Sequence, residues 1–522
     1  MAKIIKYILS FKIALAVLLI LVILELIVIL ILNSGHHVFT MDDAYIQLRM
    51  AENLLKGHYG INLNEPSSPS SSILWIFLLA PFAQLSFSNY IVLIINTLCA
   101  AGTLFLFWKV LTTIFNSEPE NKKTNVAITW ILILLIFATN LISLVFIGME
   151  HSLQVFLVTM IICGLFHEIE QNKVEWWLLT AIVAAPLIRY ENFAISLIAI
   201  IYLFFRGYYK KSFIVAGLII LLFGSFTIFL MNLKLSPLPT SVKFKLSTNS
   251  VTADDEPFTF FIERFTEDPR ALLLLIGMIF ISYFSFFKKA AKKKKLLGYM
   301  VSLGILLHLL VGKYDSFNRY EIYIYIVAIL TVLYLYKDMI QKMVSENKII
   351  KAGLFLSLAV ILLFSPYIKA TILTPIASNN IYEQQYQMHR FAVDYYKRPV
   401  AVNDLGYVAF RNNNYVLDLW GLSSSDALKY RASETSSDWM NKIAKDHNVK
   451  FAMIYDEWFD DIPGRWKKLG KLELGKLKVT PSLSSVSFYA LDEPAFTTVQ
   501  NELHKFVNTL PAGCKFVFTK KE

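Results

Sequence analysis

Two adjacent carboxylates, Asp42 and Asp43, come shortly after the first long apolar run of the chain, residues 12–32. Removing a carboxylate from water at a membrane boundary is unfavourable, so a pair at this point calls for a partner or for chemistry. A positioned carboxylate can accept a proton from a hydroxyl group and act as a general base. Thr40 and Asp43 also have the spacing of a helix capping box, and the pair alone leaves that structural interpretation open.

Further ionisable residues stand near the ends of later apolar runs. They are Glu150 with the neighbouring His151, Arg189, Glu191, Lys243, and Arg319 with the neighbouring Tyr320, while His308 lies within another run, close to its end. Each of them has a structural explanation when taken singly. An acidic residue favours a helix N-terminus, and an arginine at the end of a span can extend to the lipid headgroups. The co-location of these residues, not any one of them, indicates a site.

The composition is that of an integral membrane protein. Of the 522 residues, 56% are hydrophobic and 17% are charged, whereas a soluble domain has roughly 25% charged residues. The net charge of +11 comes largely from short Lys and Arg clusters between apolar runs, which is typical of cytoplasmic loops and argues against a nucleic-acid partner. The chain has no Walker loop, dinucleotide-binding glycine motif, His-Glu-x-x-His or Gly-x-Ser-x-Gly, so ATP coupling, zinc peptidase chemistry and serine hydrolysis have no support.

Eleven apolar runs are predicted to be transmembrane helices. They lie near residues 12–32, 90–111, 126–146, 151–169, 175–188, 192–206, 212–232, 270–287, 296–312, 320–336 and 349–369. Residues 73–87 are also apolar, but counting them as a span would move most basic clusters to the outer side. We therefore predict an interfacial helix there, a cytoplasmic N-terminus, and an outer location for everything after Lys369.

The last part of the chain, residues 380–522, has ordinary polar composition and is predicted to be a small α/β domain. Strand-like segments near 400–403, 415–419, 450–455 and 486–491 alternate with predicted helical segments at 381–396 and 436–446. The predicted fold is thus a polytopic α-helical membrane protein of about eleven spans with an extracytoplasmic α/β domain. The membrane domain covers residues 1–372, and its first outer loop, 33–89, carries juxtamembrane helices.

This topology places the candidate site residues on one face of the membrane. The candidate carboxylates and cations then converge in outer loops, as a site requires. Glu25, near the middle of the first run, is an exception. A proton-coupled transporter would use such a residue, but a protonated Glu bonded to a neighbouring helix is the favoured explanation.

Several short motifs follow one another in a fixed order. They are Asp42 to Ile46, Ser68-Pro69 with Leu74-Trp75, Gly148-Met149-Glu150-His151, Arg189-Tyr190-Glu191-Asn192, Pro237 to Lys243, Arg319-Tyr320, Asp404-Leu405-Gly406 and residues 418–422. This order resembles the GT-C superfamily of multi-pass glycosyltransferases that use polyprenyl-phosphate sugars. The nearest group is the AftB-like arabinofuranosyl- and mannosyltransferases, with ArnT and the protein O-mannosyltransferases more distant. Tyr190 and Asn192 depart from the family pattern, as does the spacing around Pro239.

The resemblance implies an activity and a role for each candidate. Asp42 is expected to be the general base with Asp43 in support, and Glu150 and Glu191 to orient hydroxyl groups of the substrates. The phosphate of the donor is expected to meet Arg189, Lys243 or Arg319, with His308 near them, and His151 and Tyr320 are further substrate-binding candidates. No cofactor is firmly implied; a divalent cation, if one is used, would sit on Asp43 and Glu150.

The implied partners are a polyprenyl-phosphate sugar, the bilayer, and a glycan, glycolipid or protein acceptor in the cell envelope. The implied location is the bacterial inner membrane. Two other classes of function stay open from the residues: a transporter or flippase of lipid-linked glycans, and a non-catalytic envelope assembly protein or one resembling O-antigen ligase. The sugar, acceptor and linkage do not follow from the sequence.

Overall fold

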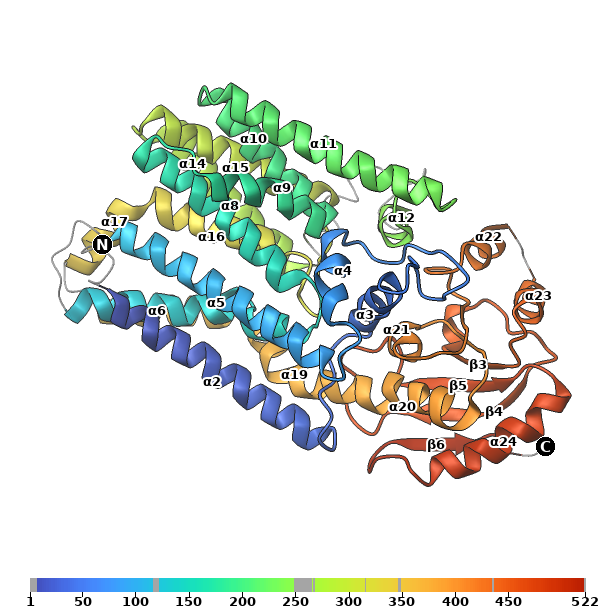
Figure 1. Cartoon of the computed structure of the whole chain (residues 1–522). Coiled ribbons are helices and arrows are strands. Elements are labelled where there is room, and N and C mark those ends of the chain that lie inside the picture. The colour runs from blue at the N-terminus through green and yellow to red at the C-terminus, as the bar shows by residue number, and fades with distance from the viewer. Residues whose placement is uncertain are drawn as a thin grey trace.

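The computed structural model describes residues 7–115, 122–247, 265, 268–314, 316–345, 349–433 and 436–520. A bundle of long helices occupies one part of the molecule and a smaller domain built on a β-sheet occupies the other, with the chain entering the second from the first (Figure 1). The protein is a polytopic α-helical membrane protein with a C-terminal α/β domain, as the composition predicted. The N-terminal lysines Lys3 and Lys6 lie outside the described residues.

Each of the eleven predicted spans is helical in the structure. Six helices are long and apolar enough to cross a membrane: α2 (Ile8–Leu32), α5 (Ser88–Ile114), α8 (His151–Gln171), α11 (Tyr209–Asn232), α14 (Pro269–Phe287) and α15 (Lys292–Val311). The pair α18 (Ile349–Leu363) and α19 (Ser365–Glu383) adds a span bent by 66°. The remaining four, α6 (Lys122–Ala138), α9 (Trp176–Ile188), α10 (Phe193–Phe205) and α16 (Ile322–Leu335), are shorter apolar helices.

Two of the predicted spans have different boundaries in the structure. The third ends at Ala138 because Asn140 adopts a left-handed conformation with φ of 53°, and a short helix, α7 (Leu141–Phe146), follows it. The eleventh bends between α18 and α19, where Pro366 stands in the first turn of α19 and cannot continue the preceding helix.

The apolar segment 73–87 does not form a span. It folds as α4 (Leu74–Leu79) and the short 3₁₀ helix η1 (Ala80–Phe82). A helix of six residues is about 9 Å long, far shorter than a bilayer core of about 30 Å. The Ile73 N–H donates to the carbonyl oxygen of Leu187, which fixes this segment beside the end of α9, next to α3 (Asp43–Leu54).

The bundle has two chemically different ends. At one end, basic side chains contact polar groups of neighbouring segments. Arg206 pairs with Glu168, Lys211 donates to the carbonyl oxygen of Val174, and Lys337 pairs with Glu170. The other end carries α3, α4 and the sheet domain (Figure 1). The loops predicted to share a side of the membrane are therefore grouped at the same end, while the orientation of the molecule in the membrane stays a prediction.

The sheet of the C-terminal domain has six strands in the order β2-β1-β3-β5-β4-β6. β1 (Val400–Val402), β2 (Val416–Asp418) and β3 (Phe451–Ile454) are parallel, and β5 (Ser485–Ala490), β4 (Lys467–Glu473) and β6 (Lys515–Phe518) are antiparallel. The helices of the domain are α20 (Gln385–Arg390), the π-helix η3 (Phe391–Tyr396), α21 (Gly406–Ala409), α22 (Ser425–Ser433), α23 (Asp438–Asp446), the 3₁₀ helix η4 (Asp456–Trp458) and α24 (Glu493–Val507). The four predicted strands are present. β4 and β6 were not predicted.

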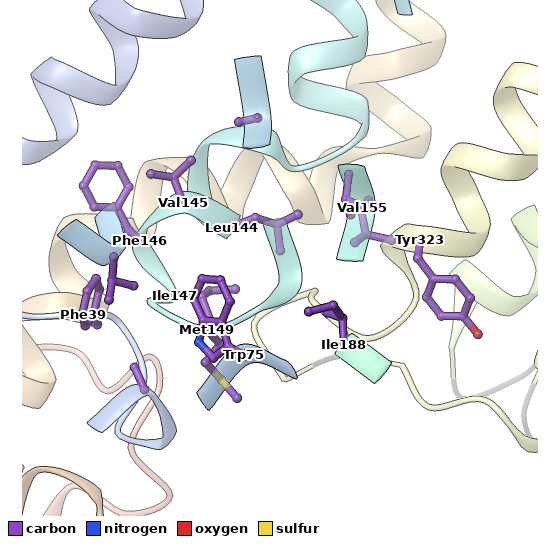
Figure 2. Close-up of a cluster of buried hydrophobic side chains, with 14 of the residues drawn as sticks. Phe39, Trp75, Leu144, Val145, Phe146, Ile147, Met149, Val155, Ile188 and Tyr323 are labelled. Atoms are coloured by element: carbon purple, nitrogen blue, oxygen red, sulfur yellow. The ribbon is translucent and has the colours of Figure 1, made fainter. Parts of the chain in front are cut away.

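The membrane bundle and the sheet domain share one helical connection. α19 runs past the predicted boundary between residues 372 and 380 and is followed directly by α20 and η3. Buried apolar residues of both parts belong to one continuous core. A section of this core, including Phe39, Trp75, Phe146 and Ile188, packs at the end of the bundle that carries α3 (Figure 2).

Candidate active site

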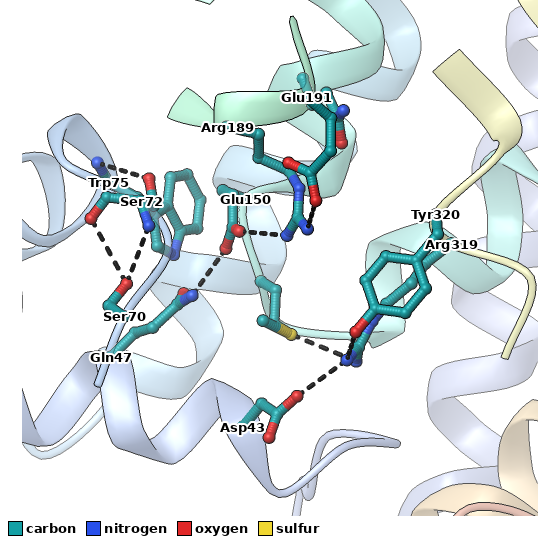
Figure 3. Close-up of polar contacts among 12 residues, drawn as sticks. Asp43, Gln47, Ser70, Ser72, Trp75, Glu150, Arg189, Glu191, Arg319 and Tyr320 are labelled. Atoms are coloured by element: carbon teal, nitrogen blue, oxygen red, sulfur yellow. Dashed lines mark hydrogen bonds and ion pairs between the residues drawn. The ribbon is translucent and has the colours of Figure 1, made fainter. Parts of the chain in front are cut away.

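A pocket lies where the membrane bundle meets the C-terminal domain. Its volume is about 80 Å³, and its lining comes from seven separate parts of the chain: Asp43, Ile46, Gln47, Pro69, Ser70, Ser71, Met149, Arg189, Ser241, Arg319, Tyr320 and Leu422. Nine of these residues belong to motifs that the sequence analysis singled out: Asp43, Ile46, Pro69, Met149, Arg189, Ser241, Arg319, Tyr320 and Leu422. The folding of the chain therefore brings distant motifs to one place (Figure 3).

One side of the pocket is an ion pair between α3 and the segment before α16. Arg319 donates from one terminal nitrogen to Asp43 Oδ2 at 2.8 Å and to the Tyr320 hydroxyl at 3.1 Å (Figure 3). The side chain of Asp43 is 41% exposed, whereas that of Arg319 is 3% exposed. Asp43 Oδ1 bonds to no described residue, so one carboxylate oxygen stays available to a ligand.

The Arg319 guanidinium also has spare hydrogen-bonding capacity. Its other terminal nitrogen faces the sulfur of Met149 at 3.3 Å, a weak acceptor, and its Nε has no hydrogen-bond partner in the described part of the chain. Burial lowers the pKa of Arg319, but Tyr320 and Asp43 more than offset this and leave the pKa above its ordinary value. The guanidinium is thus a fixed positive charge with donors left over for an anion.

The other side of the pocket is a buried network around Glu150. Glu150 accepts from Gln47 at 2.7 Å and from Arg189 at 2.6 Å, and Arg189 also donates to Glu191 at 2.8 Å. Glu150 and Arg189 are almost fully buried. Burial lowers the pKa of Arg189, but the charges of Glu191 and Glu150 raise it above its ordinary value overall. The Arg189 and Arg319 guanidinium groups both lie over the Tyr320 ring, at 5.6 and 5.0 Å from its centre.

The turn before α8 holds Met149 and Glu150 in place. Gly148 has φ of +74°, and a Cβ at this position would overlap the ring of Phe39. Phe39 and the neighbouring Ile147 are buried in the apolar cluster of Figure 2. The glycine of the Gly-Met-Glu motif is therefore required by close packing, and the packing fixes the direction of the Glu150 side chain.

Asp42, the predicted base, lies outside this pocket. Its two carboxylate oxygens accept the backbone N–H groups of Gly406, at 2.6 Å, and Tyr407, at 2.7 Å, at the start of α21 in the C-terminal domain. Burial and the neighbouring carboxyl group of Asp404 raise the pKa of Asp42 well above its usual range. The structure thus directs Asp43 towards the pocket and Asp42 towards the other domain.

The other predicted residues take different positions. His151 is buried with its ring 6.3 Å from that of Tyr320, next to the pocket. His308 lies on α15, where its Nδ1 is 2.9 Å from the Tyr323 hydroxyl, and it does not line the pocket. Lys243 is exposed on α12 (Thr240–Ser247), and the residue of that segment which lines the pocket is Ser241.

The sequence analysis missed several pocket residues. Gln47 stands one helical turn after Asp43, so the i, i+4 spacing on α3 could have identified it. Ser70 and Ser71 lie in a loop held by hydrogen bonds between Ser70 and Ser72. Leu422 stands in the motif 418–422 but was not predicted as a site residue; it comes from the loop after β2, where Asp418 accepts the N–H groups of Trp420, Gly421 and Ser423.

Asp43 and Glu150 do not fit a divalent cation as they are arranged. Both Glu150 oxygens are engaged by Gln47 and Arg189, and Asp43 is paired with Arg319. Within the described ranges, no three His, Cys, Asp or Glu side chains gather in a way that could hold a metal ion.

Comparisons with known proteins give weak similarities. A family model described as a domain of unknown function (DUF8728) matches residues 379–489, less than half of the chain. No curated protein sequence matches. The apo oligosaccharyltransferase of Archaeoglobus fulgidus is similar over 93% of this chain and 78% of its own, with 11% identity and a TM-score of 0.45.

Two further solved structures give similar values. ArnT from Cupriavidus metallidurans bound to undecaprenyl phosphate is similar over 91% of this chain and 99% of its own, with 10% identity and a TM-score of 0.46. The archaeal oligosaccharyltransferase AglB from Archaeoglobus fulgidus, in complex with an inhibitory peptide and a dolichol-phosphate, is similar over 97% of this chain and 76% of its own, with 11% identity and a TM-score of 0.45. Similarity at this level assigns no function to the chain.

Proposed function

We propose that the protein is a membrane glycosyltransferase that moves a sugar from a polyprenyl-phosphate donor to an envelope glycan, glycolipid or protein acceptor on the extracytoplasmic face. The observation that carries this proposal is the ion pair of Asp43 and Arg319 in one pocket. It combines a half-exposed carboxylate that has a free oxygen with a guanidinium that has spare donors. The order of motifs that resembles the GT-C superfamily gives independent support.

The proposed chemistry uses Asp43 as the general base. The acceptor hydroxyl gives its proton to Asp43 Oδ1 while its oxygen forms a bond to the anomeric carbon of the donor. The bond from that carbon to the phosphate oxygen breaks, and the polyprenyl phosphate leaves with the electron pair. Because the acceptor attacks on the side opposite to the leaving phosphate, a single displacement inverts the anomeric configuration.

Arg319 is proposed to stabilise the leaving phosphate. Negative charge grows on the phosphate oxygens as the bond breaks, and a buried cation with donors aimed at that point lowers the barrier. A phosphate needs no proton to leave, so one carboxylate is enough for the reaction. Of the three cations considered from the sequence, Arg189 is already paired with two carboxylates, those of Glu150 and Glu191, and Lys243 is exposed outside the pocket. Arg319 is the best-placed of them.

The Glu150 network is proposed to shape the pocket for sugar hydroxyls. Gln47 binds Glu150 and lines the pocket beside Ser70, so both residues present polar atoms next to Asp43. His151 and Glu191 border the same network. The C-terminal domain is proposed to help bind the acceptor, since its Leu422 closes part of the pocket.

The test is a transfer assay with purified protein, a panel of polyprenyl-phosphate sugars and extracted envelope glycan. We expect the wild type to transfer sugar and Asp43→Asn to lose about 100-fold or more of the rate, because general base catalysis contributes about 10²–10⁴-fold. Asp426→Asn, which changes a carboxylate on α22 with a 61% exposed side chain, is the matched control and should keep full activity.

Two results would contradict the proposal. Full activity of Asp43→Asn would remove Asp43 as the base. A wild-type protein that moves lipid-linked glycan between leaflets of a vesicle without forming a glycosidic bond would favour the flippase alternative.

A further inference from the structure

The segment before α16, residues 316–321, has an unusual backbone next to the pocket. Three consecutive residues, Ser316, Phe317 and Asn318, have positive φ angles of 54°, 61° and 56°. Positive φ is uncommon for residues other than glycine; Asn tolerates it best, whereas a bulky residue such as Phe rarely adopts it. Such a backbone persists only where surrounding contacts hold it, and here it directly precedes Arg319.

Asn318 makes three contacts with distant parts of the bundle. Its side-chain Nδ2 donates to the carbonyl oxygen of Pro366 at 3.1 Å, and its Oδ1 accepts from Arg270 Nη1. A carbonyl oxygen only accepts and an arginine only donates, so the amide satisfies both, whereas a carboxylate of the same shape would satisfy one. The backbone oxygen of Asn318 accepts from Asn140 Nδ2 at 3.1 Å.

These contacts bring two breaks in the predicted spans to the same residue. The third span ends where Asn140 adopts a left-handed conformation, with φ of 53°, and the eleventh bends beside Pro366. Asn140 and Pro366 both bind Asn318. Two interruptions that lie far apart in the chain therefore meet at the residue next to Arg319.

Arg270, at the start of α14, holds the same segment at a second point. It pairs with Glu321 Oε1 at 3.2 Å in addition to its contact with Asn318. Arg270 is itself held by Asp268, whose two carboxylate oxygens accept from Nε at 2.8 Å and from Nη2 at 2.6 Å. The residues on both sides of the Arg319-Tyr320 motif are thus bound to one guanidinium that is fixed by its own carboxylate.

We propose that Asn318 is a positioning residue for Arg319: its contacts hold the turn of positive φ, and the turn directs the Arg319 guanidinium into the pocket. Asn318 does not line the pocket, so it acts through its neighbour. Arg319 is 3% exposed and reaches Asp43 on α3, and a shift of its backbone would therefore move its donors. This role deepens the proposed glycosyltransferase function and rests on it, because Arg319 is the group proposed to stabilise the leaving phosphate.

The test compares two variants of Asn318 in the full-length protein. Asn318→Ala removes both side-chain contacts and also disfavours positive φ. Asn318→Gly removes the same contacts but adopts positive φ freely, so it separates the contacts from the backbone preference. Asn501→Ala, at an exposed position of α24, is the matched control.

Transfer kinetics report the position of Arg319. Both Asn318→Ala and Asn318→Gly should lower kcat/KM for the polyprenyl-phosphate sugar by about 100-fold, the scale expected when a group is misplaced by about 1 Å. KM for the acceptor should stay unchanged, since the acceptor is not bound by Arg319. Asn501→Ala should match the wild type in both quantities.

A double-mutant cycle separates positioning from a general structural role. If Asn318 acts through Arg319, its replacement has nothing left to misplace once Arg319 is alanine. Asn318→Ala combined with Arg319→Ala should therefore have the same kcat/KM as Arg319→Ala alone, whereas a separate structural defect would add its own loss. Hydrogen–deuterium exchange of residues 316–322 gives a readout that does not depend on activity, and it should be faster in both Asn318 variants.

Three results would overturn the inference. Wild-type kcat/KM in Asn318→Gly would show that the side-chain contacts do not position Arg319. A further loss in the double variant would show that Asn318 acts independently of Arg319. Unchanged exchange in both Asn318 variants would show that this residue does not hold the segment. If the wild type transfers no sugar, the proposed function fails, while the exchange measurement still decides whether Asn318 holds the segment.

Discussion

The ion pair of Asp43 and Arg319 decides what the pocket can do at the level of single residues. An arginine presents its donors in a planar fork, whereas a lysine offers one compact charge on a flexible stem. The Arg319 fork reaches Asp43, Tyr320 and Met149 at once. The planar shape of the Arg319 guanidinium, as well as its charge, therefore determines its contacts in the pocket.

A change at Arg319 should affect use of the donor more than use of the acceptor. Arg319→Ala is expected to lower kcat/KM for the polyprenyl-phosphate sugar by about 100-fold, since one stabilising donor group at a developing charge contributes about 10²–10³-fold. Arg319→Lys should fall between Arg319→Ala and wild type. Arg398→Ala, at an exposed position of the C-terminal domain, is the control. Unchanged donor kinetics in Arg319→Ala would exclude this residue from the phosphate site.

The buried pair of Glu150 and Arg189 matters for stability as well as for the site. Removing one partner of a buried ion pair leaves an uncompensated charge and costs about 3–5 kcal/mol. Since Arg189 keeps Glu191, Glu150→Ala should lie near the lower end of that range and lower the midpoint of thermal unfolding in detergent. Glu502→Ala, which removes a surface pair with Lys505 on α24, should change stability by less than about 1 kcal/mol. Equal midpoints for the two variants would contradict a stabilising role of Glu150.

The sequence could predict which motifs meet but not which of two neighbouring carboxylates faces the pocket. Consecutive residues of an α-helix point about 100° apart, so Asp42 and Asp43 cannot face the same way at the start of α3. The choice depends on the rotation of α3, which is set by contacts with α21 of a distant part of the chain. No local pattern contains that information.

At the level of elements, the loops that follow three parallel strands of the sheet domain lie together at the end of the sheet that faces the membrane bundle. β1, β2 and β3 are parallel, so their carboxyl ends share one edge of the sheet, and Asp404, residues 419–422 and Tyr455 follow these ends. This edge faces α3 and the pocket. Ligands commonly bind at such an edge in open sheets with parallel strands.

The loop after β2 offers a prediction at this level. Asp418 accepts three backbone N–H groups and so fixes the loop that carries Leu422. Asp418→Ala should leave these donors unpaired and loosen the loop, which should raise KM for the acceptor several-fold and change kcat less. Kinetics with varied acceptor at saturating donor will measure this split. An unchanged KM would show that the loop does not contact the acceptor.

The strands that the sequence analysis missed lie at the antiparallel side of the sheet. β4 carries three lysines and one glutamate in seven residues, and β6 is a short edge strand near the end of the chain. Charged residues are typical of strands that face solvent, and they hide the alternation on which strand prediction depends. The long apolar helices were easier to predict, because a run of about twenty consecutive apolar residues has few alternatives to a membrane-spanning helix.

At the level of the whole molecule, the proposed function depends on sidedness. The basic loops and the C-terminal domain lie at opposite ends of the bundle. Alkaline phosphatase fused after residue 520 should be active in a bacterial host, because it folds only outside the cytoplasm, and a fusion after Lys210 should be inactive. The opposite pattern would place the pocket in the cytosol and contradict the proposal.

The helical path from α19 to η3 runs from the membrane bundle into the C-terminal domain. It begins at Ser365, after the 66° bend, and ends at Tyr396, just before β1. A helix in a membrane adjusts its tilt when the thickness of the hydrocarbon layer changes. Because the same rod carries the strand that leads to Asp404, such a tilt would be transmitted to the C-terminal domain. Acyl-chain length of the surrounding lipids is thereby expected to become a determinant of the reaction rate.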